Sequence, residues 1–133
     1  MAEGAVHLFR CRVYYEDTDL AGVVYYANYL KFIERARTEW AREAGIDQGR
    51  LRAEQGVVFA ARRVEADYLA PARFDDLLEV RTVPEGGSGA RLVLVQEVWR
   101  ESERLFAARV TLVAMDGAGR PRRIPAGMRG GSG

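Results

Sequence analysis

The chain has 133 residues, of which 48% are hydrophobic and 29% are charged, and its length suits a single domain at residues 1–133. The 20 Lys and Arg residues nearly balance the 19 Asp and Glu residues, which argues against a nucleic-acid-binding protein with its usual basic excess. No apolar run approaches the ~20 residues of a membrane span, and a single cysteine, Cys11, excludes an internal disulfide and favours a cytoplasmic location.

The first predicted element is a strand. Apolar and polar residues alternate from His7 to Glu16, which is typical of a strand with one buried face. Small and acidic residues between Asp17 and Gly22 end the alternation and predict a turn. Cys11 lies on the apolar side of this strand, so we interpret it as a small buried residue.

A long helix is predicted next, over Asn28 to Ala44. Asn28 is a suitable N-cap and Gly45 a suitable stop. The apolar residues of this segment recur at three- and four-residue spacing, as on one face of a helix. They are Tyr29, Phe32, Ala36, Trp40 and Ala44.

The rest of the chain predicts at least four further strands joined by short loops. Alternating runs cover residues 58–68, 78–82, 92–99 and 105–115. Glycines around Ser88 predict a loop, Glu101–Glu103 predicts a hairpin, and residues from about 126 to 133 predict a flexible tail. Strands joined by such short connections form an antiparallel sheet, so we expect an α+β fold with the helix packed across that sheet.

Candidate functional residues gather between the first strand and the helix. Glu16, Asp17 and Asp19 place three carboxylates within four residues. They can be interpreted as acidic residues that cap the helix and complement its dipole. Alternatively they form a reaction site, because tyrosines cluster here, Gly22 permits close backbone approach, and a helix N-terminus offers N–H donors to an oxyanion. The residue types alone leave both interpretations open.

A longer stretch of sequence resembles a known family. The run from Tyr14 to Leu30, YYEDTDLAGVVYYANYL, is followed by FIERARTE from Phe32 and by DYLAPARFDD from Asp67. Together they resemble the hotdog-fold acyl-CoA thioesterases, in particular the 4-hydroxybenzoyl-CoA and Tol-Pal-associated branches. The resemblance implies an antiparallel sheet wrapped around one long central helix, and assembly into a homodimer or homotetramer.

The resemblance places the family's catalytic aspartate at Asp19. It implies that backbone N–H groups near the helix start, from Val24 to Tyr26, bind the thioester carbonyl, with Tyr26 in a positioning role. Tol-Pal-associated members commonly have histidine where this chain has Tyr26, whereas the hydroxybenzoyl branch has tyrosine. The matching signature also implies a set of substrate-binding residues: Gly22, Val23, Val24 and Asn28.

Arg91 is a further candidate, since it follows the glycine loop and would suit the phosphates of coenzyme A. The chemistry needs one carboxylate, either as a nucleophile that forms a mixed anhydride or as a general base toward water. We expect no cofactor and no metal, because the lone histidine, His7, has no partners at ligand spacing. The predicted function is hydrolysis of a short-chain or aromatic acyl-CoA. The alternatives are a thioesterase for acyl carrier protein and a non-catalytic module that binds acyl groups or a partner.

Overall fold

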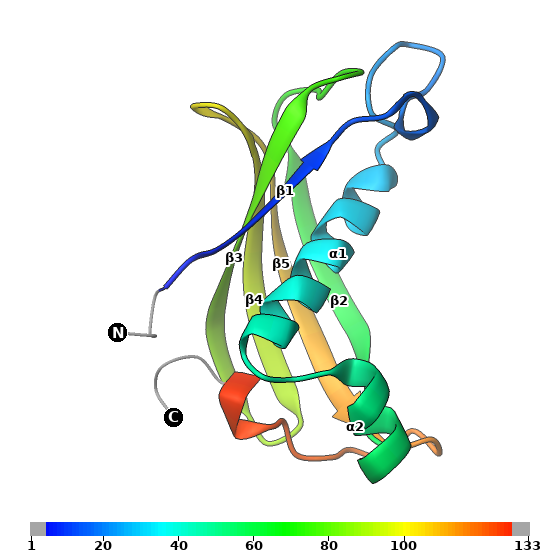
Figure 1. The fold of residues 1–133 in the computed structure, drawn as a ribbon, viewed down its shortest axis with the longest axis vertical. Coiled ribbons are helices and arrows are strands. Elements are labelled where there is room, and N and C mark those ends of the chain that lie inside the picture. The colour runs from blue at the N-terminus through cyan, green and yellow to red at the C-terminus, as the bar shows by residue number, and fades with distance from the viewer. Residues whose placement is uncertain (1–4, 129–133) are drawn as a thin grey trace.

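The computed structural model describes residues 5–128, which form one antiparallel sheet curved around a long helix (Figure 1). The strand order is β1-β3-β4-β5-β2, so β1 and β2 are the two edges. This arrangement confirms the predicted α+β class and the antiparallel pairing of the two strands around the hairpin at residues 101–103. The bounds are β1 (His7–Arg12), α1 (Asn28–Glu43), α2 (Gln48–Gln55), β2 (Val58–Tyr68), β3 (Leu77–Ser88), β4 (Arg91–Arg100) and β5 (Glu103–Met115), with short 3-10 helices at Tyr15–Asp17 and Ala126–Met128.

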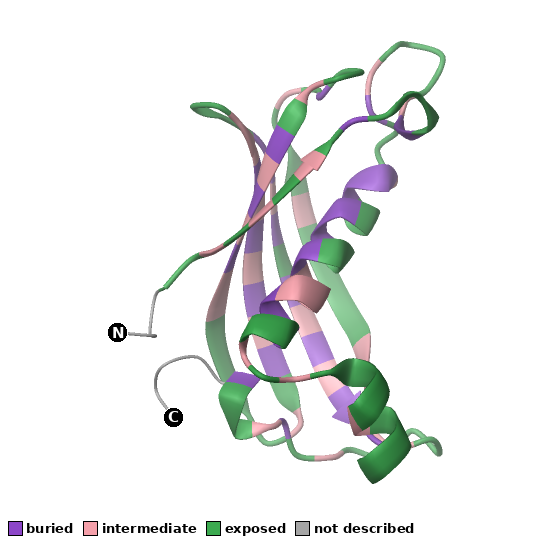
Figure 2. Cartoon of the chain, in the orientation of Figure 1, coloured by how far each residue is buried: buried purple, intermediate pink, exposed green. Residues whose placement is uncertain are grey.

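Helix α1 buries the predicted apolar stripe against the inner face of the sheet, where it packs most closely on β1, β3 and β4. Its buried side turns toward the strands in Figure 2, and its C-terminal end is exposed. Leu30 on α1 is 41% exposed. On β2, Val64 and Tyr68 are 40% and 48% exposed. The inner face of β2 is therefore incompletely covered by the chain's own helix.

Strand β2 differs from its predicted pattern because of a β-bulge. A regular alternation over residues 58–68 would place Val58, Val64 and Tyr68 on one face. The pairing with β5 shifts by one residue between Ala61 and Arg63, and such an extra residue exchanges the two faces of a strand. Phe59 and Ala61 therefore line the helix side together with Leu112, while Val58 turns to the outer face.

Sequence periodicity did not predict α2, because Gln48–Gln55 has no apolar stripe and buries none of its residues. Its two end signals were nevertheless present. The Asp47 side chain accepts a hydrogen bond from the Arg50 N–H at 3.0 Å, and Gly56 ends the helix with a φ of 68°, a backbone conformation that favours glycine. Sequence periodicity alone thus overlooks a short exposed helix whose evidence lies in its caps.

Two further boundaries also differ from prediction. Strand β3 continues past Pro84 to Ser88, where a loop was expected. Because β1 pairs only as far as Thr82, the β3 edge beside Pro84 has no neighbouring strand among residues 5–128, and proline is tolerated there. Residues Ala126–Met128 of the expected tail instead form a short 3-10 helix in which Met128 is buried; residues 129–133 lie outside the described residues. Neither helix within residues 5–128 has the length and apolar character needed to cross a membrane.

Candidate active site

The loop before α1 is fastened to the helix by the buried carboxylate of Asp17. One oxygen, Oδ1, accepts a 2.6 Å hydrogen bond from Asn28 Nδ2, and Oδ2 accepts one of 2.8 Å from the Tyr14 N–H. The Asp17 carbonyl also accepts from the Tyr25 N–H at 2.9 Å. Asn28 is consequently the first residue of α1 rather than its N-cap, which is Ala27. Its amide, predicted to bind substrate, is buried and occupied by Asp17.

Asp19 lies in a tight, exposed turn within this loop. The Gly22 N–H donates to the Asp19 carbonyl at 2.9 Å, and the turn requires the positive φ of Gly22, 81°. Asp19 Oδ1 accepts from the Ala21 N–H at 2.9 Å, whereas Oδ2 makes no hydrogen bond within residues 5–128. One carboxylate oxygen is thus held in place and the other is free to meet a reactant.

The backbone N–H groups near the helix start divide into occupied and unoccupied donors. Val24 donates to the Ala72 carbonyl at 2.8 Å, and Tyr25 to Asp17. The N–H groups of Tyr26 and Ala27 form no hydrogen bond within the described part of the chain. Of the N–H groups from Val24 to Tyr26 that the resemblance implied, only that of Tyr26 has no acceptor among the described residues, and the dipole of α1 favours negative charge beside it.

A bridge between Thr18 and Val24 holds the Asp19 turn against the start of the helix. Val23 forms a second bridge, to Arg73 in the loop before β3. Two predicted substrate-binding residues, Val23 and Val24, thus contribute backbone contacts that shape the site. The free oxygen of Asp19 and the free N–H of Tyr26 consequently lie on neighbouring segments.

An aromatic cluster borders this junction, and of its members sequence reasoning had given a role in the site only to Tyr26. Tyr68 on β2 donates its hydroxyl to the Tyr26 carbonyl at 3.0 Å, and its ring meets the Tyr26 ring edge-on. Tyr29 stacks on Phe106 with ring centroids 4.9 Å apart. Burial is the main cause that raises the pKa of Tyr29 and of Tyr68, so both hydroxyls stay protonated near neutral pH. The clue was Tyr68 itself, an aromatic residue on the helix-facing side of an incompletely covered strand.

Arg91 does not join this group within one chain. It pairs with Ser88 at the far end of β3, whereas the start of β3, Leu77, pairs with Arg12 beside the Asp17 loop. Eleven residues of extended strand separate these ends, a span of roughly 36 Å. Arg91 instead borders a shallow hollow at the β3–β4 hairpin.

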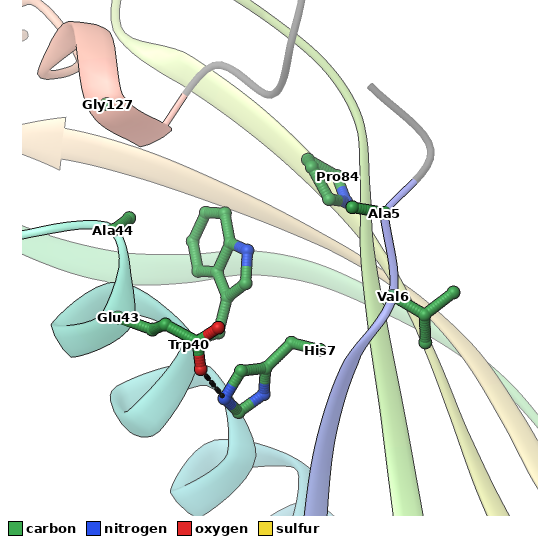
Figure 3. Close-up of a pocket in the computed structure, with 8 residues that line it drawn as sticks. All are labelled: Ala5, Val6, His7, Trp40, Glu43, Ala44, Pro84 and Gly127. Carbon is green, nitrogen blue, oxygen red and sulfur yellow. Dashed lines mark ion pairs between the residues drawn. The ribbon is translucent and has the colours of Figure 1, made fainter. Parts of the chain in front are cut away.

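His7 also lies away from the candidate site, in a separate pocket beside the C-terminal end of α1 (Figure 3). Its Nε2 is 3.2 Å from Glu43 Oε2, and its buried Nδ1 has no hydrogen-bond partner among the described residues. Trp40 and Pro84 form apolar walls of the same pocket. Among residues 5–128, no three His, Cys, Asp or Glu side chains lie close enough together to hold a metal ion.

Comparisons with known proteins agree on one family and one fold. The pattern of the thioesterase superfamily matches residues 21–107. An acyl-CoA thioester hydrolase, YbgC, from Escherichia coli is 45% identical over 122 residues, covering 89% of this chain and 90% of that protein. The crystal structure of a probable thioesterase from Bartonella henselae superposes with a TM-score of 0.87 at 36% identity, covering 91% of this chain and all of that one.

A third likeness concerns the fold alone. A mutant 4-hydroxybenzoyl-CoA thioesterase crystallised with 4-hydroxybenzoyl-CoA superposes with a TM-score of 0.86 at 21% identity, covering 91% of this chain and 94% of that one. These neighbours share the sheet wrapped around one long helix. The predicted hotdog fold is therefore confirmed.

Proposed function

Because this chain belongs to the thioesterase superfamily and is a thioester hydrolase, we propose that it hydrolyses acyl-CoA with Asp19 as its catalytic carboxylate. Asp19 acts either as the nucleophile, forming a mixed anhydride that water then opens, or as the base that activates water. The N–H of Tyr26 stabilises the oxyanion that develops on the thioester carbonyl, assisted by Ala27. The products are the free acid and coenzyme A.

One observation carries the proposal: an Asp19 oxygen and the Tyr26 N–H, both without hydrogen bonds inside the described chain, lie on segments joined by the Thr18–Val24 bridge. A carboxylate and an oxyanion donor are the two groups that thioester hydrolysis needs from an enzyme, because the thiolate leaves without a proton donor. The hydrogen bond between Asp17 and Asn28 holds the loop against the first turn of the helix. Gly22 admits the substrate by presenting no side chain.

We propose that the working form contains at least two copies of the chain, a homodimer or a homotetramer. Within residues 5–128 the outer edge of β2 has no strand partner, and long uncovered edges invite pairing. Beside it, Leu30, Val64 and Tyr68 expose apolar surface, which a second copy would cover across a two-fold axis. Arg91, remote from Asp19 within one chain, would then bind coenzyme A phosphates only if the assembly brings it to a neighbouring copy's site.

The proposal is tested by incubating the purified protein with short-chain and aromatic acyl-CoAs, and with the same acyl groups on acyl carrier protein, while thiol release is followed. We expect turnover of at least one acyl-CoA. Faster release from the carrier protein would assign the substrate to that class instead. Binding without any thiol release would favour a non-catalytic module. The cytoplasmic location expected from the lone Cys11 stays a prediction that fractionation of cells can check.

The two roles of Asp19 can be separated by a single turnover in ¹⁸O-labelled water with enzyme in excess. Label on Asp19 identifies a nucleophilic carboxylate, because water that opens the mixed anhydride at the aspartyl carbonyl leaves its oxygen there. A general base leaves Asp19 unlabelled and places all the label in the product acid. Mass spectrometry of the peptide that contains Asp19 reads the outcome.

A further inference from the structure

A chain of buried hydrogen bonds ends at the guanidinium of Arg37, halfway along α1. Gln96 on β4 is fully buried, and its Nε2 donates to the Ile33 carbonyl and to Thr82 Oγ1, both at 2.9 Å. This fixes the orientation of the amide, so Gln96 Oε1 faces outward as an acceptor. It accepts from Arg37 Nη1 at 3.1 Å. The core thus holds the guanidinium in one position.

Arg37 has no carboxylate partner within the described residues. Most ion pairs of this chain join arginines to nearby Asp or Glu, but none includes Arg37. Glu34, which borders the same cleft as Arg37, accepts a 2.8 Å hydrogen bond from Thr38 Oγ1. Burial lowers the pKa of Arg37, and the charge of Glu34 only partly offsets this effect. A desolvated guanidinium with unused N–H donors favours an anionic ligand, and carboxylates fit its planar fork.

The guanidinium borders a narrow cleft of about 120 Å³ between α1 and the inner face of β2 and β5. Phe59, Ala61 and Leu112 form an apolar wall with Trp40 at one side, and Glu34, Thr38 and Gln48 line the cleft beside Arg37. Arg37 is the one cationic side chain in this lining, and an apolar wall opposite an oriented cation suits a small organic group that carries negative charge. The cleft is too small for a nucleotide but large enough for the end of an aliphatic chain.

This cleft lies in line with the candidate active site. Arg37 is nine residues from Asn28, a rise of about 14 Å along α1. On the facing strand, Tyr68, Val64 and Ala61 follow one another along the helix side of β2, and all three are exposed in the single chain. They mark an incompletely covered apolar path from the Tyr26 end of the helix to the cleft.

We propose that Arg37 binds a carboxylate at the far end of the acyl group, so that the preferred substrates are ω-carboxyacyl thioesters of medium length. This inference rests on the proposed function, since it assumes that the thioester carbonyl sits at the Tyr26 N–H. The acyl chain then follows the inner face of β2, and its terminal carboxylate pairs with the guanidinium that Gln96 holds. Arg37 is a specificity residue and takes no part in bond cleavage.

The test compares matched substrates that differ only at the far end: octanoyl-CoA, ω-hydroxyoctanoyl-CoA and suberoyl-CoA, with their six- and ten-carbon counterparts. We expect the wild type to favour the carboxylated member at one chain length by roughly 10- to 100-fold in kcat/KM. Arg37→Met keeps the length of the side chain but removes its charge. It should abolish this preference and leave hydrolysis of octanoyl-CoA within about threefold of wild type.

Arg35→Met is the matched control, because it removes the same charge from an exposed position on the same helix. The charge of Arg35 acts on Cys11 of β1. This variant should change neither rate. Thermal unfolding of each variant verifies that the fold is intact. Equal wild-type rates for methyl and carboxylate ends, or a preference for the hydroxyl, would overturn the inference while the thioesterase function stands. Absence of hydrolysis with every substrate would instead reject the proposed function.

Discussion

The Asp17 carboxylate and the Asn28 amide, eleven positions apart, share a buried hydrogen bond of 2.6 Å. It joins the loop that carries Asp19 to the first turn of α1. The two residues therefore act as one support beneath the candidate active site. Neither needs to touch a substrate to influence the reaction.

Replacement of Asn28 by Ala should lower the free energy of unfolding by about 1–3 kcal/mol, because a buried carboxylate oxygen of Asp17 loses its donor. Urea denaturation measures this loss. Since the loop also positions Asp19, kcat should fall more than KM changes. Asn28→Asp, which places a second carboxylate against the first, should be more destabilising than Asn28→Ala. Equal stability of Asn28→Ala and wild type would contradict the supporting role.

The hydroxyl of Tyr29 should stabilise the loop before β3. It accepts a 3.0 Å hydrogen bond from the buried Ala72 N–H, and Ala72 in turn accepts from Val24. Tyr29→Phe keeps the ring stacked on Phe106 but removes that acceptor, at an expected cost of roughly 1–2 kcal/mol. Hydrogen exchange should become faster at the Ala72 N–H. Unchanged exchange there would show that the hydroxyl does not hold this loop.

Stability should depend on pH through Cys11. Burial is the main cause that raises the pKa of its thiol from 9.0 to about 11, with a smaller lowering by Arg35. The folded chain therefore holds this proton more tightly than the unfolded chain. Its stabilising effect is complete below about pH 9 and is lost as the pH rises through about 11.

Because tyrosines also titrate in this range, the measurement is the difference in unfolding free energy between wild type and Cys11→Ala. That difference should shrink from pH 8 to pH 11. Alkylation by iodoacetamide should be slow at pH 8 for the same reason, since the thiolate is the reactive form. Rapid alkylation of the folded protein at pH 8 would refute the burial effect.

His7→Ala should leave kcat/KM unchanged, because His7 lies in the pocket beside Trp40 and Glu43, away from Asp19. Loss of the ion pair with Glu43 should contribute less than about 1 kcal/mol to the stability change, since the Glu43 side chain is 75% exposed. Thiol release and thermal unfolding check the two expectations. A large loss of activity would require a histidine-assisted mechanism, which the geometry of one chain does not support.

The sequence could predict those parts of the fold that periodicity encodes. The apolar stripe of α1 and the alternation in β4 and β5 sufficed for the helix, the sheet and its antiparallel sense. The bulge in β2 could not be predicted from the sequence. The extra residue before Arg63 exchanges the two faces of the strand, but no residue type in this segment signals it. Helix α2 was missed because nothing in it is buried.

At the candidate site, the sequence pointed to Asp19 and the start of the helix, but it did not predict the hydrogen-bond partner of each group. Asn28 and Asp17 satisfy each other across eleven residues, a pairing that spacing does not reveal. Which N–H groups stay free was equally hidden, since Val24 finds its acceptor in Ala72, far along the chain. The proposed role of Arg37 could not be predicted from the sequence, because it depends on a hydrogen bond to Gln96 on β4.

The most direct measurement is thiol release by Asp19→Asn, which keeps the size of the side chain and the acceptor for the Ala21 N–H. With the best acyl-CoA, we predict that kcat falls by roughly 10²- to 10⁴-fold while thermal unfolding stays close to that of wild type. A folded Asp19→Asn protein that releases thiol within about threefold of the wild-type rate would contradict the catalytic role of this carboxylate.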